Sequence, residues 1–557
     1  MGLCISTASR VRCTSGRIGQ GVTSGESQLQ RYASFSCCDY CLVSKPWPVE
    51  NSPHTASIHI LDDDSLIHVF CLYRPFILGE DEDDKFYLFG GRQEWVHARW
   101  WYNLAHVCQR WRNVILGSAS YLGVSLVCTC GTPVADMLTH SPPLPLVIDY
   151  YHGYRDITED EGAILALKHR DRVRHVRLLI TVTSLKFIAA MDEEYPFLEY
   201  LIIGPPDEDR STVLLLPETL QAPHLRHLTL IGFALPIGSR LLTTAVGLVT
   251  LYLRMNDPST YFHPNALLHW LSFMPQLETL VITFFFPVPN REIERPLTRT
   301  PIITLPNLCL LWFRGVSAYL EALVHWITTP RLEKLQIDFF NQLTFSVPRL
   351  VQFMNTTENL RFDTAKFLFD DKRVRVEVYP PGEAKMKAAF MTNVFCWHLD
   401  WQVPSVAQIL NSLGHLFSAV EHLTFEHEVH SQSSEAHNKV DRTEWRKLLR
   451  PFGNVKTLWI GNGLVEQLSR SLDLEDGELP LELLPELQEL TYSGSGNTSD
   501  AFTSFIDAHR NADRAITVVR HNPSTDSFHT IPSEHSERSE PSPITRASSE
   551  AGNDFDT

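Results

Sequence analysis

Two stretches in the first quarter of the chain carry apolar residues at helical spacing. In 104–116 the apolar positions recur at steps of three and four, namely Leu104, Val107, Trp111, Val114 and Ile115. This spacing predicts one amphipathic helix anchored by Trp111. In 58–70, acidic residues come first, as suits a helix N-terminus, and Leu66, Val69 and Phe70 then share one side. Two such helices can bury their apolar stripes only against each other and a further element.

Beyond residue 170 an eight-residue apolar pattern, an octet, is repeated along the chain. Its plainest form is Pro-x-Leu-x-x-Leu-x-Leu. Plain copies occupy 196–203, 223–230, 275–282, 306–313 and 330–337, and looser copies occupy 171–178, 246–253, 418–425, 453–460 and 485–492. From 171 to 330 successive copies start 25, 27, 23, 29, 31 and 24 residues apart. We expect the last three residues of each octet to form a short strand, and the apolar third residue to lie under the preceding turn.

The segments between octets complete a repeating unit. Helical patterns such as 266–274 and 319–327 are followed by the Pro of the next octet, which stops a helix. One unit cannot bury its apolar face alone, so neighbouring units must stack around a continuous core with parallel strands. The octet repeat is interrupted at 370–382. There, apolar and polar residues alternate strictly over 372–379, and the segment ends at Pro-Pro-Gly, as an exposed strand would. We expect a bend or an insertion there.

These patterns divide the chain into four parts and predict an α/β fold. Residues 1–54 are rich in Ser, Gly, Cys and Arg and are expected to be a disordered arm. Residues 55–127 form a helical domain with an acidic insert at 78–100, and 118–126 is expected to be a turn and a short strand. Residues 128–515 form the repeat array, and 516–557, rich in Ser, Pro and Glu, form a disordered tail.

The composition of the chain argues against two classes of protein, those that bind nucleic acid and those that span a membrane. A chain of 557 residues with 44% hydrophobic residues can build several cores or one elongated array. Its formal net charge of −17 and its lack of a Lys/Arg cluster argue against a nucleic-acid partner. No run of eighteen apolar residues is present, so we expect no transmembrane segment.

No pattern in the chain predicts catalysis. The sequence contains no Gly-x-Ser-x-Gly elbow, no Walker loop and no Gly-x-Gly-x-x-Gly after a strand. The densest histidine group, His422, His427, His430 and His437, does not match a zinc-binding spacing. The acidic run 80–84 lacks the alternation and the Gly of a calcium loop. We therefore expect no catalytic residue, no metal site and no cofactor.

The helical domain resembles an F-box. The family has a Leu-Pro-x-Glu start, a helix ending near Ile-Phe and a later Val-Cys-Arg-x-Trp-Arg helix. For the later helix, this chain has Val107-Cys-Gln-Arg-Trp-Arg112. For the start and the first helix, it has a partial match in Leu61, Asp64, Leu66, Val69 and Phe70. The resemblance implies that one set of residues faces a Skp-type adaptor: Leu61, Leu66, Val69 and Phe70. It implies that a second set supports and partly contacts the adaptor: Leu104, Val107, Cys108 and Trp111.

The chain departs from the family in three places. Asp62 stands where the F-box has Pro, and the insert at 78–100 separates the two helices. The octets lack the Asn or Cys that usually follows the strand of a leucine-rich repeat, so they are similar to irregular repeats.

Together, 55–515 resembles the F-box/leucine-rich-repeat proteins, especially the large sets of mushroom-forming fungi. This implies the substrate receptor of a cullin-RING (SCF-type) ubiquitin ligase, not itself an enzyme. Its partners would be a Skp-type adaptor, through it a cullin, and an unknown target protein held by the solenoid, in the cytoplasm or nucleus. One alternative is a leucine-rich scaffold without a ligase role. The other is a signalling adaptor tethered to a membrane by lipids on Gly2 and Cys4, because Met1-Gly-Leu-Cys-Ile-Ser6 fits an N-myristoylation pattern.

Overall fold

The structure is a computed structural model of the 557-residue chain. It describes residues 60–74, 99–151, 161–179, 185–205, 213–287, 301–382 without 341, 343, 358 and 361, 388–427, 440–473 without 462, 482–493 and 501–521. Internal contacts divide the chain into two units, 1–62 and 63–557. Every helix, strand and contact below belongs to the second unit.

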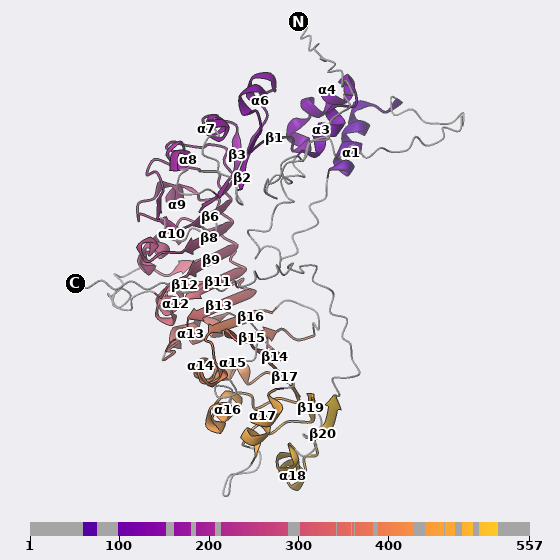
Figure 1. The fold of residues 1–557 in the computed structure, drawn as a ribbon, viewed down its shortest axis with the longest axis vertical. Coiled ribbons are helices and arrows are strands. Elements are labelled where there is room, and N and C mark those ends of the chain that lie inside the picture. The colour runs from indigo at the N-terminus through magenta and orange to yellow at the C-terminus, as the bar shows by residue number, and fades with distance from the viewer. Residues whose placement is uncertain are drawn as a thin grey trace, which may run out of the picture. The chain divides into compact units, whose positions relative to one another are not determined.

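The second unit begins with short helices and continues as alternating strands and helices (Figure 1). The first helices are α1 (Asp63–Tyr73), α3 (Trp100–Ala105), α4 (Gln109–Gly117) and α5 (Ala119–Leu122). The later helices are α6 (Val134–His140), α7 (Glu161–Leu167), α8 (Leu185–Ala189), α9 (Arg240–Thr244), the 3-10 helix η5 (Pro258–Thr260), α10 (Pro264–Leu271), α12 (Ser317–Val324), α13 (Pro348–Thr356), α14 (Leu399–Ser412), α15 (Gly414–Phe417), α16 (Arg442–Leu449), α17 (Val465–Leu472) and α18 (Thr503–Asn511).

In the described part of the chain, sixteen strands form one sheet. They are β1 (Leu126–Thr129), β2 (Leu146–Tyr151), β3 (Val173–Leu179), β4 (Tyr200–Gly204), β6 (His227–Ile231), β8 (Thr250–Met255), β9 (Thr279–Phe284), β11 (Leu310–Gly315), β13 (Lys334–Phe340), β14 (Thr364–Phe369), β15 (Arg373–Tyr379), β16 (Phe390–Phe395), β17 (His422–His427), β18 (Thr457–Ile460), β19 (Glu489–Ser493) and β20 (Thr517–His521). Two two-stranded sheets pair β5 (Leu214–Leu215) with β7 (Phe233–Ala234) and β10 (Ile303–Thr304) with β12 (Ile327–Thr328). The predicted α/β class is confirmed.

Each of the ten octets supplies one strand of the main sheet. In nine of them the strand begins at the fifth residue, as at Tyr200 in 196–203. The apolar third residues of the plain copies are fully buried, namely Leu198, Leu225, Leu277, Leu308 and Leu332. The sixth and eighth residues are buried as well, as Leu280 and Ile282 illustrate in β9. The strand and the turn expected from the octet are therefore both confirmed.

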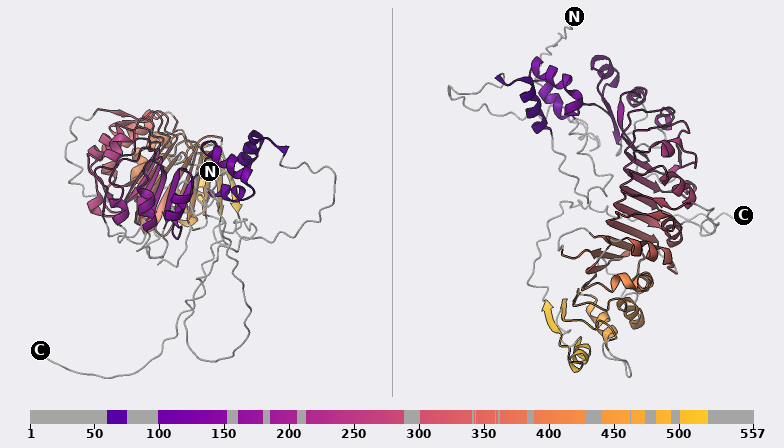
Figure 2. Two further views of the ribbon diagram at one scale, coloured as in Figure 1. Left: turned by 90° about the horizontal axis from the view of Figure 1, so that it is seen from above. Right: turned by 180° about the vertical axis from the view of Figure 1, so that it is seen from behind.

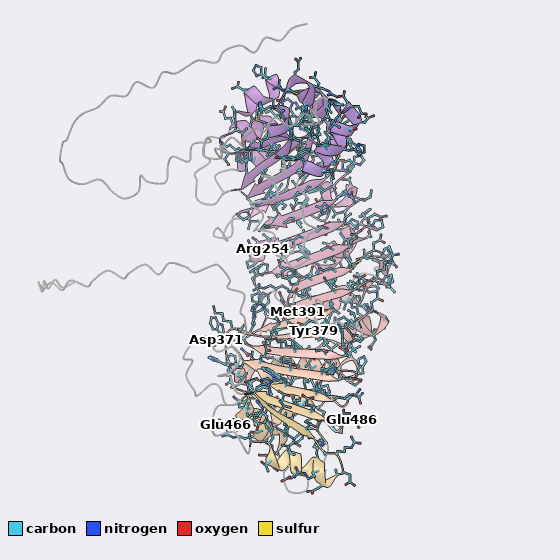
Figure 3. The ribbon with its side chains drawn as sticks, turned by 90° about the vertical axis from the view of Figure 1, so that its right-hand side faces the viewer. Arg254, Asp371, Tyr379, Met391, Glu466 and Glu486 are labelled. Atoms are coloured by element: carbon cyan, nitrogen blue, oxygen red, sulfur yellow. The ribbon has the colours of Figure 1, made fainter. Side chains whose placement is uncertain are left out.

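Helices line one face of the sheet. Figure 1 shows α7 to α10 and α12 along the same side of the strands, and Figure 2 shows this arrangement from behind. The two helices predicted between octets are present as α10 and α12. Both end earlier than expected; after α12, residues 327–328 leave the helix and pair with 303–304. The strands present their other face in Figure 3.

The break predicted at 370–382 is a reversal of strand order. The sheet runs β13-β16-β15-β14-β17, so the chain crosses to β14 and returns through β15 and β16. β15 is antiparallel to both of its neighbours, whereas the other described pairings are parallel. Val374, Val376 and Val378 are fully buried on one face of β15. The alternation predicted for 372–379 is therefore correct, but the strand lies inside the sheet and is not an exposed one.

The structure changes two predicted boundaries. Residues 119–122, expected in a turn and a strand, form α5, which ends at Gly123 in the left-handed conformation with φ 64°, and the strand begins only at Leu126. At the other end, β20 pairs in parallel with β19. The array thus continues to His521, past the boundary expected at 515.

His509 in α18 is buried without a hydrogen-bond partner for either ring nitrogen among the described residues. Burial, and next the charge of Arg514, lower the pKa of His509 below its usual value of about 6.5. Between these two pKa values the unfolded chain binds more protons than the folded chain. The stability of α18 is therefore full above about pH 6.5 and falls as the pH drops toward the folded-state pKa.

Hydrogen exchange at 501–521 tests this pH dependence. We expect faster exchange at pH 5.5 than at pH 7.5 after correction for intrinsic rates, and a smaller difference in His509→Phe, which cannot be protonated. An equal pH dependence in both proteins would contradict the assignment.

Candidate functional site

The helical segment has an aromatic core. Leu66 and Phe70 of α1 are fully buried, and Trp111 of α4 is 9% exposed. The rings of Phe70 and Trp111 meet edge to face with centroids 5.0 Å apart. Since α1 also packs against α4 and α5, the two predicted apolar stripes do bury each other.

The single helix predicted over 104–116 is instead two helices. Residues 106–108 leave the helix, and Cys108 takes an extended conformation at the N-cap of α4, where its Sγ accepts the backbone N–H of Trp111 at 3.5 Å. Arg112 Nε donates to the carbonyl of Ala105 at 3.1 Å, which satisfies an acceptor at the end of α3. Val107 lies in this break, so it is 58% exposed and is not part of a buried stripe.

Helix α1 is apolar on two sides. Leu66 and Phe70 face the core, whereas Val69, Leu72 and Tyr73 are 39%, 87% and 59% exposed. Val69 and Leu72 are three residues apart and therefore lie on one side of the helix. An exposed apolar group of this kind on a short helix is typical of a surface that contacts another protein.

A groove of about 590 Å³ lies between α1 and α4. It is lined by Asp63, Ile67, Gln109, Arg110, Asn113, Val114, Gly117 and Ser118. Two of the lining residues are paired, since Arg110 donates from Nη2 to the carboxylate of Asp63 at 2.8 Å. The lining is thus mostly polar, but it includes Val114, which is buried in the apolar core.

The eight residues predicted to contact or support the adaptor differ in their exposure to solvent. Four are buried within the helical segment, namely Leu66, Phe70, Leu104 and Trp111. Cys108 is partly buried, and Val69 and Val107 are exposed. Leu61 is exposed and lies in the first unit. Gly2 and Cys4 lie outside the described residues.

A second candidate surface is the strand face away from the helices. Asp338 of β13 is 4% exposed on this face and accepts three hydrogen bonds from neutral side chains. Trp312 Nε1 donates at 3.0 Å, Asn393 Nδ2 at 2.6 Å and Gln336 Nε2 at 3.4 Å. These contacts link β11, β13 and β16, so the carboxylate fixes three neighbouring strands through their outward side chains.

The network continues into the antiparallel strand. Arg375 donates to Asn393 Oδ1 at 3.3 Å and lies 3.4 Å from Glu377. Tyr379 donates its hydroxyl to Glu377 Oε2 at 2.7 Å, and burial together with this carboxylate raises the pKa of Tyr379. Figure 3 shows Tyr379 and Met391 over the strands on this face.

Trp312, Gln336 and Asp338 were missed from the sequence because they fall on positions that the octet leaves undefined, and the network residues of β15 and β16 were missed because those strands belong to no octet. The seventh residue and the one after the octet both point away from the helices, as Trp312 and Arg314 do in β11 and Gln336 and Asp338 do in β13. A search for polar and aromatic residues at these two positions would have found the part of the network in β11 and β13, but not the part in β15 and β16.

No protein-family model matches the chain, and a search of curated proteins finds no significant similarity. Within the described ranges, no group of three or more His, Cys, Asp or Glu side chains could hold a metal ion. None of the helices that the structure describes is both long and apolar enough to cross a membrane.

Proposed function

We propose that the chain is the substrate receptor of an SCF-type ubiquitin ligase. Its helical segment would dock on a Skp-type adaptor, and its strand face would hold the target protein. The observation that carries the proposal is the apolar outer side of α1, where Val69 and Leu72 are exposed beside a well-packed Phe70 and Trp111 core. A helix with two apolar sides can bury the second side by binding a partner.

The repeat pattern supports the second half of the proposal. Ten octets that each add a strand to one sheet are what an irregular leucine-rich solenoid would produce. Such an array presents a row of outward side chains, and its specificity lies in those side chains. The receptor would perform no bond chemistry, since the adaptor and the cullin recruit the catalytic subunits.

The buried positions of Leu66 and Phe70 change the residues that we assign to adaptor contact. A partner cannot reach these side chains, so we assign contact to Val69, Leu72 and Val107, with Tyr73 at the end of α1. Leu66, Phe70, Leu104 and Trp111 then hold the helices that present this surface.

Co-expression with a fungal Skp-type adaptor, followed by size-exclusion chromatography, tests the proposal. We expect the full chain to co-elute with the adaptor and the double variant Val69→Asp, Leu72→Asp to elute separately. Two charges at an apolar interface would remain desolvated and unpaired, which costs several kcal/mol.

A matched control is Leu215→Asp with Ile237→Asp. These residues are 69% and 62% exposed in the repeat array, so the variant makes the same change in charge and also replaces two exposed apolar side chains, but away from α1. We expect it to co-elute like the unmodified chain. Co-elution of both variants would contradict the assigned surface, and the lack of any complex would favour a leucine-rich scaffold without a ligase role.

A further inference from the structure

Two exposed tryptophans lie where β16 leads into α14. Trp397 is 66% exposed and Trp401 is 55% exposed, whereas every other tryptophan that the structure describes is buried or half-buried. His398, the N-cap residue of α14, stands between them in the sequence, and its ring meets that of Trp401 edge to face at 5.9 Å. Tryptophan is highly buried on average and is enriched at the centres of protein interfaces. The pair is therefore a candidate contact surface.

The turn between β14 and β15 is fixed against this pair. Gln402 of α14 is 1% exposed and donates from Nε2 to the carbonyl of Asp370 at 2.7 Å and to that of Cys396 at 2.9 Å. Arg373 pairs with the carboxylate of Asp370 at 3.0 Å, which holds the turn itself. Figure 3 shows Asp371 of this turn at the edge of the strand face. The surface therefore has a fixed shape before a partner binds, which lowers the entropy lost on binding.

A lysine of the chain already lies against one of the two rings. Lys372 Nζ lies over the ring of Trp397, 6.0 Å from its centroid. The face of an indole ring carries negative charge and attracts an ammonium or guanidinium group. Trp397 keeps 66% of its surface exposed beside this lysine, so the ring has room for a second group. The intramolecular contact indicates which kind of group these rings attract.

The residues around the two rings have a negative charge overall. Segments 370–373 and 397–401 contain three aspartates, one lysine and one arginine. Oδ1 of Asp400 is buried and has no hydrogen-bond partner among the described residues. Burial first, and then the charges of Asp400 and Asp370, raise the pKa of the Cys396 thiol to about 12, which places both carboxylates close to residue 396. A positive group on this surface therefore meets an uncompensated negative charge.

We propose that Trp397 and Trp401 bind a lysine or arginine side chain in a basic segment of the target protein. The indole faces contact the alkyl stem and the cation, and Asp400 supplies the opposite charge. The formal net charge of −17 attracts basic segments and repels acidic ones, so the charge of the whole chain favours this partner. The inference rests on the proposed function, because it names the chemistry of the target that the receptor holds.

Fluorescence anisotropy with the full chain tests this surface. The probes are four labelled Gly-Ser peptides of equal length that carry lysine, glutamate, leucine or serine at the same two positions. We expect the lysine peptide to bind most tightly, and its binding to weaken at higher salt because exposed charges are screened. Tighter binding of the leucine peptide would indicate an apolar partner and overturn the proposal.

The double variant Trp397→Leu, Trp401→Leu keeps two apolar side chains and removes both indole faces. It should weaken binding of the lysine peptide about tenfold, because two cation–π contacts at exposed sites are lost. The matched control is Phe197→Leu with Phe273→Leu, which makes the same kind of change at residues that are 49% and 36% exposed elsewhere in the array. It should bind within about twofold of the unmodified chain, because distant sites are independent.

Lys372→Gln should change binding in the opposite direction. The substitution removes the cation that competes for the ring of Trp397, so the lysine peptide should bind about two- to fivefold more tightly. A variant that failed to fold could not bind more tightly, so this result is independent of any loss of structure in the tryptophan variant. Weaker or unchanged binding would overturn the proposal that the ring of Trp397 takes a cation of the target.

The results separate this inference from the proposed function. Equal binding of the lysine and serine peptides, or equal weakening by the tryptophan and phenylalanine variants, would overturn the surface even in a chain that binds the adaptor. Binding of the lysine peptide that depends on the two tryptophans, in a chain that binds no adaptor, would support the surface and contradict only the ligase role.

Discussion

Trp111→Ala is expected to destabilise the helical segment by about 3 to 5 kcal/mol, because it empties a large buried site in a small core. The indole is 9% exposed and meets Phe70 edge to face. The surrounding helices are short, so they offer little else to hold α1 in place. Since α1 carries the proposed adaptor surface, the same substitution should abolish adaptor binding.

Hydrogen exchange of peptides from 63–74 and 99–122 measures this effect locally, even if the repeat array unfolds separately. The control is Trp397→Ala, which removes the same side chain at a site that is 66% exposed and should change stability by about 0.5 kcal/mol or less. Similar exchange in the two variants would show that Trp111 does not hold the segment together.

Phe284→Ala should have the second largest effect, again about 3 to 5 kcal/mol. Phe284 is fully buried at the end of β9, and its ring contacts five others, those of Tyr261, Phe262, Phe286, Phe313 and Tyr319, at centroid distances from 4.9 to 6.4 Å. These rings come from several successive strands and helices of the array. Their packing is therefore one of the links between neighbouring repeat units.

Urea unfolding followed by circular dichroism measures this loss of stability. Phe273→Ala is the matched control, since Phe273 is 36% exposed just after α10 and should cost much less. If Phe284→Ala shifts the unfolding midpoint no more than Phe273→Ala does, the aromatic cluster does not stabilise the array.

The repeat strands could be predicted because the octet itself contains the residues that form each strand and the turn before it. Its apolar third, sixth and eighth residues are buried in copy after copy, and a strand needs only this alternation and a turn before it. The helix break at 106–108 could not be predicted from apolar spacing, because it depends on Cys108 capping α4 and on Arg112 reaching Ala105. Such local hydrogen bonds compete with helix continuity and leave no periodic signal.

The reversal at β14 to β16 was partly predictable. Strict alternation in 372–379 indicated a strand, but the choice between an edge and a central position depends on which strands pair with it, a long-range property. The candidate site on the strand face was hidden for a related reason. Register brings Asp338 and Asn393 side by side although 55 residues of sequence separate them.

The most direct test of the account is calorimetric titration of the purified full chain with a purified Skp-type adaptor. The account predicts saturable one-to-one binding that is lost in Val69→Asp, Leu72→Asp and kept in Leu215→Asp, Ile237→Asp. The absence of binding between two proteins that circular dichroism shows to be folded would contradict it.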